Sequence, residues 1–198
     1  KMINRNILIS APGPYSICLR DCSKYIGNHV NLSVILIDNT FYEKNLLKRK
    51  NFKNSFSNIY FDWSNYGFIE KLTTSEIYKK AAEIERKLDY PISKIINADR
   101  RYSFGLNCKL TQNYSLPFEY TEVLRNFIRI NHTVETAFKE SSPSKCLNFG
   151  SANISDILVE IHAKKQFIEF KQIKATKISN FISSNSSGLS NKYLKKEE

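Results

Sequence analysis

Short apolar runs alternate with amphipathic stretches along the chain, and this alternation predicts strands and helices in turn. Apolar residues within 6–10 and 32–37 predict two buried strands, and apolar residues at helical spacing between 15 and 26 predict a helix that joins them. The turn Ala11-Pro12-Gly13-Pro14 ends the first strand. Such a unit places its two strands parallel, through a right-handed crossover.

The pattern in the middle of the chain predicts one further strand followed by helices. Residues 59–63 predict a third strand, and Thr73 with Glu76 forms a capping box at the start of an amphipathic helix. Four positions of that helix share its apolar face: Ile77, Ala81, Ile84 and Leu88. A short helix is expected after Pro91 and a long one over 120–138.

The strand and helix alternation returns after residue 143. Strands are expected over 146–149 and 167–170, and the helix between them has an apolar stripe of Ile154, Ile157, Leu158 and Ile161. Residues 1–182 are therefore predicted to form one α/β Rossmann-like domain, a parallel sheet with helices on both faces. Residues 183–198 are rich in Ser and Asn and then charged, which predicts a linker or a disordered tail.

The formal net charge of +11 is compatible with nucleic acid, anionic lipid or a phosphorylated substrate as partner, and equally with a compositional bias toward Lys. The longest apolar run is Val34-Ile35-Leu36-Ile37, far short of a membrane span. No secretory signal is visible, so we expect a cytoplasmic protein.

The sulfur and imidazole side chains do not predict a metal site or a cofactor. The four cysteines lack a Cys-x-x-Cys pair and the three histidines are scattered, so the cysteines are expected to be small buried apolar groups.

Two strand-to-helix turns are candidate ligand contacts, because ligands of parallel sheets bind at the carboxyl ends of the strands. The first turn holds Gly13 and Tyr15, and the second holds Gly150, Ser151 and Asn153. Neither is a dinucleotide fingerprint or a P-loop. Both also fit a plain turn, with Ser151 or Asn153 acting only as a helix cap.

A third candidate is Asp99-Arg100-Arg101, at the opening of a loop. The adjacent arginines suit bidentate binding of a phosphate or carboxylate. The alternative is a local Asp–Arg bridge that holds the loop. A functional loop should lie near the carboxyl edge of the sheet, close to Gly13 or Gly150.

The same segment carries a family resemblance. Three motifs, Glu83-Ile84-Glu85-Arg86-Lys87-Leu88, Tyr90-Pro91-Ile92-Ser93 and Ala98-Asp99-Arg100, resemble the N-terminal domain of bacterial and archaeal capsule or surface-carbohydrate biosynthesis proteins. The resemblance covers residues 74–185. This chain departs from the family where Tyr102-Ser103-Phe104-Gly105 replaces a Gly-Arg-Gly run, and at Lys177 and Ser179, where the family prefers Arg and Gly.

The resemblance implies the acceptor-side half of a glycosyltransferase of the GT-B arrangement, which needs a second domain. It implies a nucleotide-sugar donor, a glycan or lipid-linked acceptor and peripheral contact with the inner membrane. Asp99 would then act as the base and Arg100 would stabilise negative charge. Gly13, Tyr15, Arg101, Gly150, Ser151 and Asn153 would contact substrate. The alternative is a basic nucleic-acid-binding α/β protein without catalysis.

Overall fold

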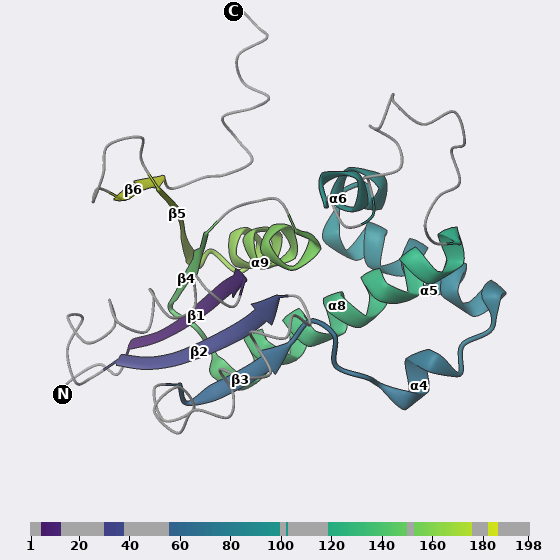
Figure 1. The fold of residues 1–198 in the computed structure, drawn as a ribbon, viewed down its shortest axis with the longest axis horizontal. Helices are drawn as coiled ribbons and strands as arrows, with labels where there is room; N and C mark the ends of the chain where they lie inside the picture. Colours follow the sequence, from purple (N-terminus) through teal and green to yellow (C-terminus); the bar gives the residue numbers. More distant parts are fainter. Residues whose placement is uncertain are drawn as a thin grey trace, which may run out of the picture.

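Six strands form one sheet in the order β3-β2-β1-β4-β5-β6 (Figure 1). This computed structural model describes residues 5–12, 30–37, 56–99, 102, 119–149, 153–175 and 182–185. The first five strands pair in parallel, and β6 is antiparallel to β5. The predicted Rossmann-like α/β class with a parallel sheet is confirmed.

The strands are short, and the strands at the centre of the sheet are strongly buried. They are β1 (Arg5–Pro12), β2 (Val30–Ile37), β3 (Asn58–Phe61), β4 (Lys145–Asn148), β5 (Glu169–Ala175) and β6 (Ile182–Asn185). Strand β1 lies between β2 and β4, with Ile9 paired to Val34 on one side and to Leu147 on the other. Continuous apolar runs are typical of parallel strands buried on both faces.

The helices follow the predicted periodicity closely. They are α4 (Gly67–Glu70), α5 (Thr74–Leu88), α6 (Ile92–Ala98), α8 (Tyr120–Ser141) and α9 (Ile154–Lys165). The capping box of Thr73 and Glu76 is present at the start of α5, and the four predicted apolar positions of that helix are its buried residues. No helix in the described part of the chain is long and apolar enough to cross a membrane.

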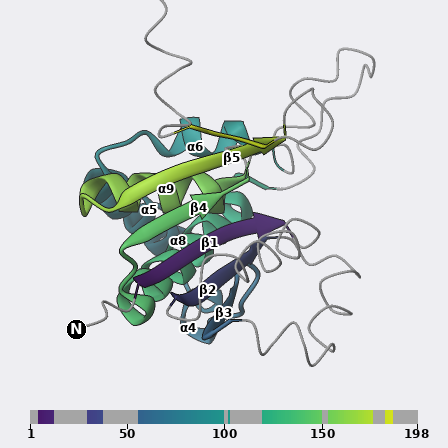
Figure 2. The ribbon, with the colours of Figure 1, turned by 90° about the vertical axis from the view of Figure 1, so that its left-hand side faces the viewer.

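The described helices cover one face of the sheet (Figure 2). Leu8 and Ile35 point to that face and share a hydrophobic core with α5, α6, α8 and α9. Ile9, Val34 and Leu36 point to the opposite face and form a second cluster. The helix expected over 15–26 lies outside the described residues, so the second face carries no described helix.

Three segments differ from the sequence-based expectation. Strand β1 continues through Ala11 and Pro12, where a turn was expected. The strand expected over 167–170 begins at Glu169 and runs to Ala175, whereas Phe167 lies in a turn and is 97% exposed. Strand β6 spans Ile182–Asn185, so the expected tail starts with three residues that pair with β5. Those residues are ordered by backbone hydrogen bonds to a neighbouring strand, which apolar content does not reveal.

Candidate functional site

The strand order changes direction between β1 and β4, and this point marks the candidate site. The chain passes from β1 outward to β2 and β3, and then returns to build β4 and β5 on the other side of β1. Open parallel sheets bind ligands at such a switch point, beyond the carboxyl ends of the strands. Here Ser10 of β1 pairs with Asn148 of β4, and α9 begins a few residues later.

Asp156, in the first turn of α9, is the most perturbed group at this edge. Ser10 Oγ donates to its Oδ1 at 2.8 Å, and Asn153 Nδ2 donates to its Oδ2 at 3.2 Å. The side chain is 1% exposed. Burial, with a smaller contribution from the nearby carboxylates of Asp62 and Asp99, raises the pKa of Asp156 to about 7, although the two hydrogen bonds act to lower it.

Asp99 reaches α9 from a distant part of the chain. Its Oδ2 accepts the backbone N–H of Ile154 at 3.0 Å, and its side chain is completely buried. Asn153 occupies the N-cap position of α9 but makes no side-chain cap hydrogen bond. Asp99 therefore satisfies an amide at the helix start that a local N-cap residue would normally satisfy.

A third buried carboxylate lies beside the same helix turn. Asp62, directly after β3, accepts a hydrogen bond from Ser155 Oγ at 3.2 Å. Asp62, Asp99 and Asp156 thus come from three separate segments and meet the first turn of α9. The partial positive charge of the helix start favours negative charge there. Burial and, to a smaller extent, the neighbouring carboxylates oppose it, and both raise the pKa of Asp156.

Asn148 adds a polar group at the carboxyl end of β4. Its side chain is fully buried, and neither its Oδ1 nor its Nδ2 has a hydrogen-bond partner in the part of the chain that the structure describes. Buried amides are almost always paired with protein, water or ligand. Asn148 pairs in the sheet with Ser10, which binds Asp156, so this unpaired amide lies at the same edge as the buried carboxylates.

The described residues contain no group of three His, Cys, Asp or Glu side chains arranged to hold a metal ion. A cavity of about 70 Å³ lies beside Asp62 and is lined also by Trp63, Tyr102 and Arg129. Its size suits a few water molecules rather than a sugar.

The structure describes two of the eight predicted site residues, Asp99 and Asn153. They lie at the same helix start: Asp99 binds the amide of Ile154, and Asn153 binds Asp156. The other six lie outside the described residues: Gly13, Tyr15, Arg100, Arg101, Gly150 and Ser151.

Sequence reasoning missed Ser10, Asp62, Asn148 and Asp156. Each carried a signal, because three are polar residues at or near the carboxyl end of a strand and the fourth is an acid in a first helical turn. Polar residues at carboxyl strand ends are the positions at which this class of sheet places its chemistry.

Comparison with known proteins identifies no family. No family model matches the sequence, and no curated protein matches it.

Proposed function

We propose that this chain forms the acceptor-side domain of a glycosyltransferase that builds surface or capsular polysaccharide from a nucleotide-sugar donor. Two observations support the proposal: the sequence resemblance over residues 74–185, and the buried polar groups at the switch point of the Rossmann-like sheet. A fold of this class alone implies no activity, so the argument depends on the site.

The observation that carries the proposal is the position of Asp99. It belongs to the Ala98-Asp99-Arg100 motif of the resemblance, and it is buried against the start of α9 at the carboxyl edge. Arg100 and Arg101 follow it directly in the chain. An arginine directly next to this buried anchor in the chain is a candidate to bind the phosphates of a nucleotide sugar.

The burial of Asp99 changes the role expected of it. A base must come within hydrogen-bond reach of the hydroxyl that it deprotonates, yet Asp99 is completely buried and already bound to the amide of Ile154. We therefore assign Asp99 to positioning the loop and Arg100 to contact with negative charge on the donor.

The test is a transfer assay on the full-length protein, with a panel of nucleotide sugars labelled in the sugar and a cell-envelope extract as acceptor. Arg100→Ala should lower transfer by about a hundredfold, since one charged contact made in the transition state is worth roughly 3 kcal/mol. Arg86→Ala is the matched control, because Arg86 is exposed on α5 and should leave transfer unchanged.

Two results would contradict the proposal. One is the absence of transfer from every nucleotide sugar by a folded protein. The other is binding to mixed-sequence oligonucleotides that weakens steeply with salt, which would favour the nucleic-acid-binding alternative.

A further inference from the structure

Strands β4 and β5 carry charged side chains on the face of the sheet opposite the described helices. Side chains alternate between the two faces of a strand. Cys146 and Phe170 belong to the core beneath the helices, whereas Leu147 belongs to the cluster on the opposite face. The alternation therefore places three charged side chains on that opposite face, and they are between 29% and 52% exposed: Lys145, Glu169 and Lys171. Parallel strands that are covered on both faces are apolar on both, so this part of the sheet suits contact with a polar group.

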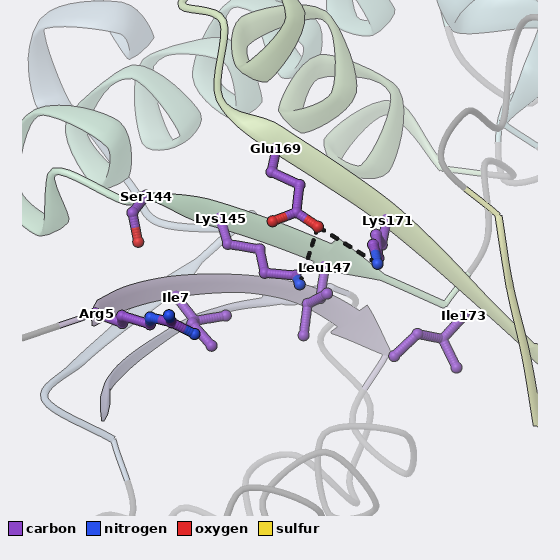
Figure 3. A pocket seen from close by; sticks show the side chains of 8 residues that line it. All are labelled: Arg5, Ile7, Ser144, Lys145, Leu147, Glu169, Lys171 and Ile173. Carbon is purple, nitrogen blue, oxygen red and sulfur yellow. Dashed lines mark ion pairs between the residues drawn. The ribbon is translucent and has the colours of Figure 1, made fainter. Parts of the chain in front are cut away.

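A cavity of about 510 Å³ follows this face from Arg5 to Ile173 (Figure 3). Its apolar lining comes from three neighbouring strands, as Ile7 of β1, Leu147 of β4 and Ile173 of β5. Its polar lining is Arg5, Ser144, Lys145, Glu169 and Lys171. Small-molecule sites have volumes of roughly 300–1,000 Å³ and combine an apolar lining with a few polar groups. The cavity therefore has the size and the composition of a ligand site.

Glu169 neutralises only part of the positive charge along this cavity. Its carboxylate lies between two strands, at 3.1 Å from Lys145 Nζ and 3.4 Å from Lys171 Nζ (Figure 3). One carboxylate thus serves two ammonium groups. Arg5 is exposed and forms no ion pair with a described residue. Three cationic groups and one carboxylate give the lining a net charge of +2.

We propose that this cavity binds a phosphate monoester with a compact apolar body. The apolar body lies against Ile7, Leu147 and Ile173. Arg5 binds the phosphate, because a guanidinium without a carboxylate partner is free to form paired hydrogen bonds to phosphate oxygens. A phosphate monoester carries about two negative charges at neutral pH, which match the net charge of the lining. This inference does not rest on the proposed glycosyltransferase activity.

The cavity is separate from the candidate site, although β1 and β4 contribute to both. Ser10 binds Asp156 of α9 and therefore points to the helix-covered face, and Asn148 is its partner in the sheet. Ile7 and Leu147 point to the opposite face. A ligand in the cavity therefore binds without displacing the contacts of Asp156.

The test is an NMR titration of the full chain with phenyl phosphate, and separately with phenol, benzoate and inorganic phosphate. Phenyl phosphate should shift the amide signals of Ile7, Leu147 and Ile173. Each of the other ligands should bind at least about tenfold more weakly, because it lacks the apolar body, the charge or the second negative charge. Binding of phenyl phosphate should weaken with salt.

Charge variants test the cavity in both directions. Arg5→Gln should weaken binding of phenyl phosphate about tenfold, since a charge-assisted hydrogen bond is lost. Glu169→Gln should strengthen it about threefold, because a negative charge beside the phosphate is removed. Lys79→Gln makes the same change of charge at an exposed position of α5, on the helix-covered side, and should bind as the wild type does. Urea unfolding of each variant checks that the fold is kept.

Four results would overturn the proposal. Wild-type affinity of Arg5→Gln would remove the role of the guanidinium. Equal affinity for phenol or for benzoate would remove the need for a phosphate monoester. Signal shifts confined to other parts of the sheet would place the ligand elsewhere. Absence of binding by the folded wild type would mean that another part of this chain or a protein partner fills the cavity.

Discussion

Asp156 keeps a raised pKa although two side chains donate hydrogen bonds to it. Burial opposes its charge more strongly than Ser10 and Asn153 favour it, and the neighbouring carboxylates act in the same direction as burial. At pH values between 3.8, the ordinary pKa of this side chain, and about 7, the folded protein therefore keeps a proton on Asp156 that the unfolded chain releases. This group favours the folded state most at low pH, and its contribution is lost as the pH rises to about 7.

Asp156→Asn should remove that dependence. Wild type should gain stability relative to the variant, by a few kcal/mol, when the pH is lowered from about 8 to about 5. Urea unfolding of both proteins at the two pH values measures the difference, in which the titration of other groups cancels. An identical stability difference at both pH values would show that Asp156 ionises normally.

Asp99 is expected to stabilise the fold whatever its part in function. Asp99→Ala leaves the Ile154 N–H buried without its acceptor and should cost about 2 kcal/mol of unfolding free energy. Asp99→Asn keeps an acceptor oxygen and should cost less. Chemical denaturation measures both, with the exposed Glu83→Gln on α5 as control. Wild-type stability of Asp99→Ala would contradict this role.

At the scale of elements, α5 and α9 illustrate two ways to stabilise a helix. Helix α5 is amphipathic and has its own capping box. Helix α9 is buried on all sides from Ile154 to Ala163, so its polar residues need partners. Glu160 pairs with Lys164 at 2.7 Å, and His162 Nε2 lies 3.3 Å from Asn131 Oδ1. Burial lowers the pKa of His162, which keeps its ring neutral inside the core.

The cap of α5 should be measurable alone. Thr73→Ala removes the acceptor of the Glu76 N–H and one partner of the Glu76 carboxylate, and it should cost about 1 kcal/mol. Thr74→Ala, an exposed position one residue later, is the matched control and should change little. Thermal or urea unfolding distinguishes the two variants, and equal effects would contradict a specific role of the cap.

At the scale of the whole molecule, the sheet is least protected at its edges. Strand β1 has neighbours on both sides and its core residues are buried, whereas β6 has four residues and, among the described strands, pairs with β5 alone. Local opening requires less free energy where fewer contacts break.

Hydrogen exchange should reveal this gradient. Amides of β1 should exchange only through global unfolding, while those of β6 should exchange through local opening at a clearly lower free energy. Mass spectrometry of peptides covering the two strands measures both. Protection of β6 equal to that of β1 would mean that the antiparallel pair is part of the central folding unit.

The sequence by itself determined the local features of this protein. The pattern along the chain predicted the apolar face and the capping box of α5, the apolar stripe of α9, and the strands around Ile9 and Val34. Each of these depends on residues within a turn or two of one another. Phe167 was predicted wrongly as part of a strand, since an apolar residue beside Ile168 and Phe170 resembles core. Only its left-handed backbone at the end of α9 turns it outward.

The tertiary structure alone decided what meets at the switch point. Asp99 binds the amide of Ile154 across 55 positions of the chain, and Ser10 binds Asp156 across 146. No local pattern encodes such contacts, because they depend on the strand order and on which helix start lies over which strand end. The raised pKa of Asp156 has the same origin: a carboxyl group meets a low-dielectric core and two other acids only after the sheet has assembled.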